Sequence, residues 1–218
     1  MTRVYRPLIN ANLQTLHPTQ LTIGYAEVEE KRRLWNTMDK KTRNDLLARH
    51  WFPCILGPGG THYVIDHHHL GLALIQEGVK SVWLMVLKDL SWLEPTQFWR
   101  VMEFHQWVHP YDQNGQRRDY DALPARLTEL ADDPYRSLAG QARVAGAFAK
   151  DSLPFSEFLW AEFFRYQIKR EALQRDFGAA LKKAIKLART EQARYLPGWA
   201  GGSMQAPAAS KIQRRNQF

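Results

Sequence analysis

Three consecutive histidines next to an aspartate are the residues best suited to chemistry in this sequence of 218 residues. Asp66, His67, His68 and His69 stand in the stretch VIDHHHLGLALIQEG. Imidazole and carboxylate groups exchange protons near neutral pH, and both bind metal ions. The cluster could therefore be a metal site, a structural feature of the surface, or a site that handles anionic ligands.

Helix geometry argues against a dedicated metal site. Neighbouring residues of a helix point about 100° apart, so at most two of the three histidines could bind one ion. A zinc site on a helix would instead place two histidines one turn apart. A purely structural role stays open, although protonated histidines are unfavourable at the positive end of a helix dipole.

The position of the cluster, between a predicted strand and a predicted helix, favours phosphate binding. Residues 61–66 have the pattern of a strand, and residues 67–77 that of a helix ended by Gly78. Asp66 is predicted to cap this helix with its carboxylate. The free N–H groups at such a helix start can bind a phosphate. Neutral histidines and a carboxylate beside them could donate hydrogen bonds, accept a proton or bind Mg²⁺.

The hydrophobic pattern predicts an α/β half followed by a helical half. Further strands are predicted at 21–23, 52–57 and 81–87, with a hairpin turn at 57–60. Helices are predicted at 26–50, 94–107, 125–133, 134–150, 154–168 and 170–196. We therefore predict a small α/β core at 1–90, a helical extension packed on it at 91–196, and a disordered tail at 197–218.

The net charge of +8 is concentrated near the C-terminus. Residues 165–218 contain twelve Lys and Arg against three Asp and Glu. Such a basic segment could bind nucleic acid, or it could form the solvated face of a helix. Residues 165–218 are accordingly the candidate segment for a nucleic-acid partner.

Composition also excludes several classes of protein. A single cysteine, Cys54, rules out an internal disulfide framework and a cysteine-rich zinc module. No apolar run approaches the roughly 18 residues of a membrane span, so no membrane partner is expected. The N-terminal residues lack the apolar stretch of a signal peptide, and a cytoplasmic location is expected.

The residues around the histidines resemble the signature of the ParB/sulfiredoxin superfamily, and more closely its branch of ParB-like nucleases. In this superfamily a strand-to-helix motif, Asp-Gly-His-His-Arg, carries nucleotide phosphates. Asp66, His68 and His69 match the aspartate and the two histidines of the motif. His67 stands where glycine is usual, and Leu70 where arginine is usual. The segments 16–35, 132–148 and 154–165 also resemble this branch, so the likeness covers most of residues 10–170.

The resemblance implies a small mixed β-sheet with a helical C-terminal extension, and it implies a nucleotide-dependent enzyme. Its members include CTP-binding DNA-partition proteins, ATP-using sulfinic-acid reductases and kinases of free serine. We accordingly expect a phosphotransferase or nucleotide hydrolase that uses ATP, ADP or CTP with Mg²⁺ and a small-molecule or protein acceptor. Asp66, His68 and His69 would be catalytic, with Asp66 holding Mg²⁺ and His67 contacting phosphate.

The same resemblance suggests residues outside the motif. In kinase-like members a glutamate from the region of Glu27 acts as general base, so Glu27 is a further catalytic candidate. Because Leu70 removes a bidentate guanidinium, other cations would have to bind the phosphates. The expected ligand-binding residues outside the motif are Thr19, Gln20, Lys31, Arg117 and Arg118.

Two other functions stay open at the level of sequence. One is a DNA-binding ParB-like protein, with or without nuclease activity, that uses the basic C-terminal helix. The other is a non-catalytic ligand-binding or adaptor domain. The sequence gives no indication of the oligomeric state.

Overall fold

A five-stranded mixed sheet confirms the predicted α+β class, in a computed structural model that describes residues 8–201. The strand order is β1-β6-β4-β5-β2. The β1–β6 and β4–β5 pairs are antiparallel, whereas the β6–β4 and β5–β2 pairs are parallel. The strands are β1 (Leu8–Asn12), β2 (His17–Pro18), β4 (Phe52–Leu56), β5 (His62–Val64) and β6 (Ser81–Asp89).

The predicted hairpin is confirmed, but both edge strands were missed. β4 and β5 pair around a turn that contains Gly59 and Gly60, each with a positive φ angle. β1 and β2 have no sequence pattern of their own that marks a strand. They become strands because β6 and β5 offer free edges to pair with.

A second, two-stranded sheet corrects the prediction of a helix at 125–133. Its strands are β3 (Thr22–Ile23) and β7 (Ala131–Asp132), which pair in parallel. Buried Leu127 and Leu130 lead into β7 through one turn of 3-10 helix. Their spacing suits one turn, and the edge of β3 then extends the chain into a strand.

Eight α-helices complete the described residues, and two of the predicted helices are each divided. The predicted helix 26–50 is two helices, because Asp39 accepts the Thr42 N–H at 2.7 Å and starts a new one. Asp176 likewise starts a new helix within 170–196 by accepting the Ala179 N–H at 2.9 Å. The helices are α1 (Tyr25–Thr37), α2 (Lys40–Arg49), α3 (His68–Gln76), α4 (Pro95–Phe104), α5 (Pro134–Val144), α6 (Ser156–Gln167), α7 (Arg170–Arg175) and α8 (Phe177–Ala188). Turns of 3-10 helix occur at Leu13–Thr15, Pro58–Gly60, Tyr120–Ala122, Leu127–Glu129 and Glu191–Ala193.

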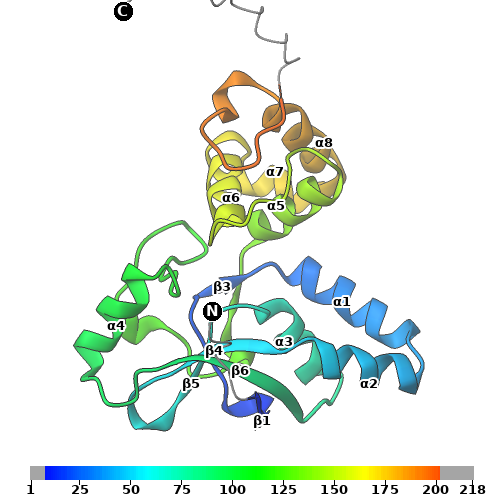
Figure 1. Cartoon of the computed structure of the whole chain (residues 1–218). Helices are drawn as coiled ribbons and strands as arrows, with labels where there is room; N and C mark the ends of the chain where they lie inside the picture. Colours follow the sequence, from blue (N-terminus) through cyan, green and yellow to red (C-terminus); the bar gives the residue numbers. More distant parts are fainter. Residues whose placement is uncertain (1–7, 202–218) are drawn as a thin grey trace, which may run out of the picture.

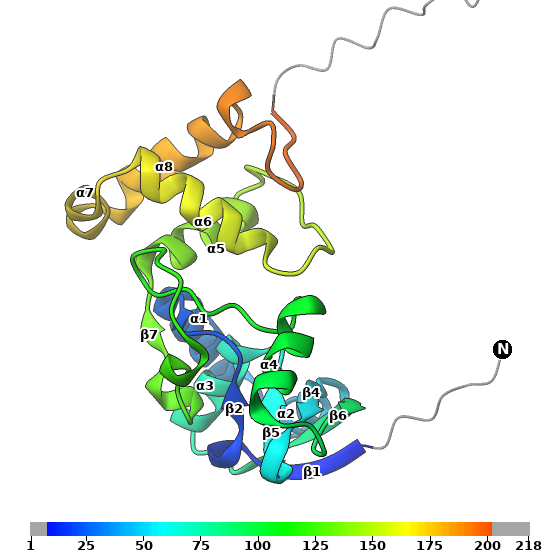
Figure 2. The same ribbon diagram turned by 90° about the vertical axis from the view of Figure 1, so that its left-hand side faces the viewer.

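The described chain forms two bodies stacked on each other (Figure 1; Figure 2). The lower body holds the sheet with α1 to α4, and the upper body holds α5 to α8 (Figure 1). None of these helices is both long enough and apolar enough to cross a membrane.

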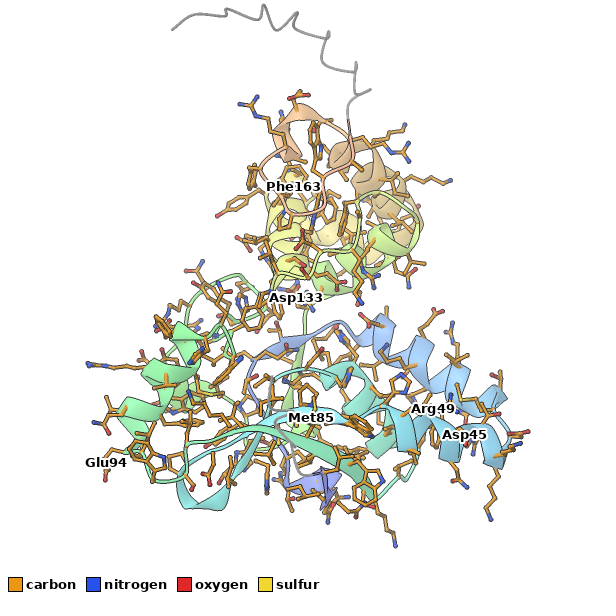
Figure 3. All side chains as sticks on the ribbon, in the orientation of Figure 1. Asp45, Arg49, Met85, Glu94, Asp133 and Phe163 are labelled. Carbon is orange, nitrogen blue, oxygen red and sulfur yellow. The ribbon has the colours of Figure 1, made fainter. Side chains whose placement is uncertain are left out.

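Each body has its own buried core, and the division falls near Asp133 rather than at residue 90. One core lies between the sheet and its helices, and a smaller one lies under α4; both include residues from beyond position 90, such as Leu127 and Phe98. The upper core begins at Tyr135 and is rich in aromatic rings (Phe163 is labelled in Figure 3). Thus 91–133 packs with the α/β core, and the helical extension begins at α5.

Residues 197–201, predicted to belong to a disordered tail, are instead packed against the upper body. The Ala149 N–H donates to the Gly198 carbonyl at 2.7 Å, and the Trp160 indole donates to the Pro197 carbonyl at 2.8 Å. Trp199 packs against the upper core. Residues 202–218 of the predicted tail lie outside the described residues.

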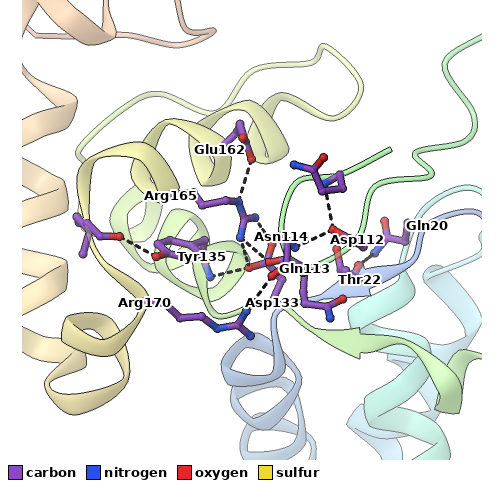
Figure 4. Close-up of polar contacts among 12 residues, drawn as sticks. Gln20, Thr22, Asp112, Gln113, Asn114, Asp133, Tyr135, Glu162, Arg165 and Arg170 are labelled. Carbon is purple, nitrogen blue, oxygen red and sulfur yellow. Dashed lines mark hydrogen bonds and ion pairs between the residues drawn. The ribbon is translucent and has the colours of Figure 1, made fainter. Parts of the chain in front are cut away.

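A buried ion pair marks the junction of the two bodies (Figure 3; Figure 4). The Asp133 side chain is 2% exposed, and its Oδ2 accepts from Arg165 Nη2 at 2.7 Å. Asp133 Oδ1 accepts the Tyr135 N–H at 3.0 Å and so caps α5. Arg165 also donates to the Gln113 carbonyl at 2.6 Å, which joins α6 to a loop of the lower body.

The turn between β5 and α3 differs from the predicted cap. The residue before the helix is His67, in the left-handed conformation with a φ of 66°, and no side chain caps α3. The Asp66 carboxylate instead accepts the His67 N–H at 2.6 Å. The positive φ explains why glycine is usual at this position of the motif.

We predict that Asp133→Asn lowers the free energy of unfolding by about 3 kcal/mol, because Arg165 loses the charge of its buried partner and keeps only Glu162. Chemical denaturation of the full chain measures this loss. Asp132→Asn is the matched control, since Asp132 is exposed and an asparagine oxygen can still accept the Tyr25 N–H. It should cost less than about 1 kcal/mol. Similar losses in the two variants would contradict a special role for the buried pair.

We predict that His67→Gly is more stable than His67→Ala by about 1 kcal/mol. Both substitutions remove the imidazole that packs against Phe52, so their difference reports only the left-handed backbone. Urea unfolding curves of the two variants give the comparison. Equal midpoints would show that the turn relaxes to a different conformation.

Candidate functional site

A cavity of about 690 Å³ lies between the two bodies and is lined by the predicted motif. The lower body contributes the turn Asp66–His69 together with Gln20 and residues of α1. The upper body contributes residues of α5 and of the segment that leads into α6. Charged and aromatic side chains of both bodies share this lining, among them Glu27, Lys31, Arg136, Arg143, Glu157 and Phe158.

His68 is a buried positioning residue of this cavity. Its Nε2 accepts the Thr19 N–H at 3.2 Å, and the Thr19 hydroxyl donates to the Val64 carbonyl at 2.9 Å. Burial lowers the pKa of His68 to about 4, so the ring is neutral at pH 7. Because the Nε2 lone pair accepts the Thr19 N–H, it is not free to bind a ligand. The ring instead holds the backbone at Thr19 next to the end of β5.

His69 has two neighbours that compete for one nitrogen. Its Nε2 lies 3.3 Å from the Gly24 nitrogen and 3.5 Å from Glu27 Oε2. Burial, with Arg136 and Lys31 nearby, lowers the pKa of His69 well below its usual value. A neutral ring whose Nε2 accepts the Gly24 N–H is therefore the favoured state, and Glu27 is not bound by an imidazolium.

Glu27 faces the cavity from α1. Its Oε1 pairs with Lys31 Nζ at 3.3 Å, and its side chain is 26% exposed. Its Oε2 lies close to α5, since a Cβ built on Gly140 would meet that atom at 3.4 Å. Glu27 and Lys31 thus provide a carboxylate and an ammonium group next to the histidine turn, as a proton acceptor and a phosphate-binding cation would require.

Asp66 is the most exposed member of the motif, with a side chain that is 73% exposed at the mouth of the cavity. Within residues 8–201 no group of three or more His, Cys, Asp or Glu side chains is arranged to hold a metal ion. Mg²⁺ differs from zinc because it binds through one or two carboxylates together with waters and substrate phosphates. Asp66 fits that kind of site.

Only some of the other predicted ligand residues reach the cavity. Gln20 lines it, although its side-chain amide donates to the Thr22 carbonyl at 2.8 Å. Thr19 is 1% exposed and serves the backbone around it. Arg117 and Arg118 lie in an exposed loop, where they pair with Glu103 at 2.8 Å and with Asp112 at 2.6 Å. The structure thus brings Lys31 to the motif but not the two loop arginines.

Sequence reasoning missed Arg136, which lines the cavity from the first turn of α5. It is 6% exposed, and its Nε and Nη1 atoms have no hydrogen-bond partner among the described residues. A signal was present in the sequence, because a cation in the first turn of a helix is unfavourable for the helix dipole. The same argument applies to protonated histidines at the start of α3.

Comparisons with known proteins agree with this architecture. Residues 9–166 match the family described as "Putative ParB-like nuclease". The crystal structure of protein Atu1540 from Agrobacterium tumefaciens is 42% identical, with a TM-score of 0.86, over 91% of this chain and 99% of that one. A search of curated proteins gives no match. The likeness over the strand-to-helix motif and most of the fold places this chain in the ParB-like nuclease family of the ParB/sulfiredoxin superfamily.

Proposed function

We propose that the chain binds a nucleotide, ATP, ADP or CTP with Mg²⁺, in the cavity between the two bodies, and transfers or hydrolyses a phosphoryl group. The strongest support is that Glu27 and Lys31 of α1 line the same cavity as Asp66, which lies just before the start of α3. Phosphoryl transfer needs mainly positioning and charge neutralisation, together with a base for the attacking hydroxyl.

The proposed roles follow from the position of each group. Lys31 and the uncapped start of α3 bind phosphate oxygens, and Asp66 holds Mg²⁺, which neutralises phosphate charge when bound. Glu27 takes the proton of an acceptor hydroxyl or of water. The hydroxyl oxygen then bonds to phosphorus, and the electron pair of the broken P–O bond stays with the leaving phosphate. His68 and His69 hold the segment that begins α1, and with it Glu27, in place.

We predict that Glu27→Gln lowers the rate of nucleotide turnover about 10²- to 10⁴-fold, because the general base is lost. The amide keeps the shape of the side chain, so nucleotide binding should persist. Phosphate release from ATP and CTP, with a parallel thermal-shift panel of ATP, ADP and CTP with and without Mg²⁺, measures both properties.

The matched control is Glu29→Gln on the same helix, since Glu29 is an exposed partner of Arg32 and does not line the cavity. It should turn over nucleotide at the wild-type rate. Equal rates for wild type and Glu27→Gln would remove Glu27 as the base. No thermal shift with any nucleotide would refute the proposed function.

Nucleic-acid binding is the second candidate, supported by the solvent face of the upper body. Ala180, Ala184 and Ala188 bury one face of α8, which leaves its lysines on the other. A groove of about 580 Å³ beside α8 is lined by several cations, among them Lys169, Arg175 and Lys183. These residues could contact a phosphate backbone.

For this candidate we predict a DNA gel shift that weakens steeply with salt and that Lys183→Glu together with Arg175→Glu abolishes. Lys88→Glu and Arg100→Glu, on β6 and α4, form the control pair with the same change in net charge. A shift that is lost equally in the control pair would show unspecific attraction, and no shift at low salt would exclude the candidate.

A further inference from the structure

Arg136 is a buried cation without a partner of its own among the residues that the structure describes. Three carboxylates act electrostatically on its guanidinium, namely those of Glu157, Glu27 and Asp133. Each of them is already paired with a different cation: Glu157 with Arg143, Glu27 with Lys31, and Asp133 with Arg165. A guanidinium keeps its charge in a protein, so its burial without hydrogen bonds is costly for the protein alone.

The guanidinium is nevertheless held in a defined place. Its Cζ lies 3.6 Å from the centroid of the Phe158 ring, so a cation–π interaction holds the group over that ring. Arg136 and Gly140 lie one turn apart on α5, and a Cβ at Gly140 would lie 3.4 Å from Glu27 Oε2 of α1. The side chain is thus fixed on the face of α5 that meets the motif of the lower body.

The opposite side of the cavity offers a second group of unsatisfied donors. α3 begins at His68 without a side-chain cap, and this helix of nine residues starts in the lining of the same cavity. Free N–H groups at a helix start and a planar guanidinium both bind the oxygens of a phosphate. The Nε2 atoms of His68 and His69 already accept the N–H groups of Thr19 and Gly24. They therefore leave the N–H groups at the start of α3 to an anion.

We propose that Arg136, which the helical extension supplies, is the phosphate-binding arginine of this cavity. It takes the place of the motif arginine, whose position is occupied by Leu70 in this chain. Leu70 does not line this cavity but an adjoining one of about 320 Å³, whose lining includes Glu27 and Lys31 as well as apolar residues such as Trp35. Arg136, by contrast, enters the larger cavity from the upper body. The inference rests on the proposed function in that it assigns the phosphate contact of the same cavity.

The test uses pyrophosphate as the probe and the full chain. Wild type, Arg136→Met and the control Arg100→Met, an exposed arginine of α4, are compared by thermal shift and titration calorimetry. Arg136→Met should unfold at an equal or higher temperature than wild type without ligand, since it removes an unpaired buried charge. It should bind pyrophosphate about tenfold or more weakly, because charge-assisted hydrogen bonds are lost. Arg100→Met should bind as wild type does.

Further arms separate this inference from the proposed function. Malonate replaces pyrophosphate to test whether a dicarboxylate is bound equally well, which would overturn the assignment to phosphate. Unchanged pyrophosphate affinity in Arg136→Met, or no binding by wild type, would also overturn it. If wild type binds pyrophosphate through Arg136 but turns over no nucleotide, only the proposed function fails. If Arg136→Met turns over nucleotide at the wild-type rate with unchanged KM, only the inference about Arg136 fails.

Discussion

The buried carboxylate of Asp133 is the interaction on which the arrangement of the two bodies depends. It lies directly after β7 of the lower body, caps the first helix of the upper body, and pairs with Arg165 of α6 (Figure 4). A carboxylate that is excluded from solvent is stable only when a cation pairs with it and its oxygens accept hydrogen bonds. These requirements fix where α5 starts and how α6 crosses it.

The start of α5 in turn determines the candidate site. Because α5 begins at the junction, its first turns pack against the start of α1, where a Cβ on Gly24 would meet the backbone nitrogen of Ser137 at 2.7 Å. Only glycine permits that approach, and the Gly24 N–H is also the donor to His69. The two bodies therefore meet at the strand-to-helix motif, and the cavity lies where they meet.

The neutral and the charged residues of the cavity have different roles. His68 and His69, which in the sequence are among the most reactive candidates, are neutral and hold backbone segments, with the pKa of His68 lowered to about 4 by burial. Glu27, Lys31 and Asp66 keep charged groups at the cavity surface. Arg136 contributes a buried cation whose Nε and Nη1 atoms have no hydrogen-bond partner among the described residues.

Features that depend on a few neighbouring residues were predictable from the sequence. The hairpin of β4 and β5, the helix after Asp66 and the strand β6 follow from local patterns, and the family follows from the motif itself. One error arose where distant pairing overrode local preference, and two arose where a local helix cap was overlooked. Residues 131–132 became a strand because β3 lies beside them, and Asp39 and Asp176 started new helices where periodicity alone suggested continuity.

The sequence by itself determined the fold class, the strand-to-helix turn and the presence of Asp66 and Glu27 as acidic candidates. Only the tertiary structure decided that His68 and His69 use their Nε2 atoms to bind Thr19 and Gly24, and that the loop arginines lie elsewhere. It also decided that Arg136 shares the cavity with the motif. The physical reason is that burial and hydrogen-bond partners are set by segments far apart in the chain, whereas turns and caps are set by adjacent residues.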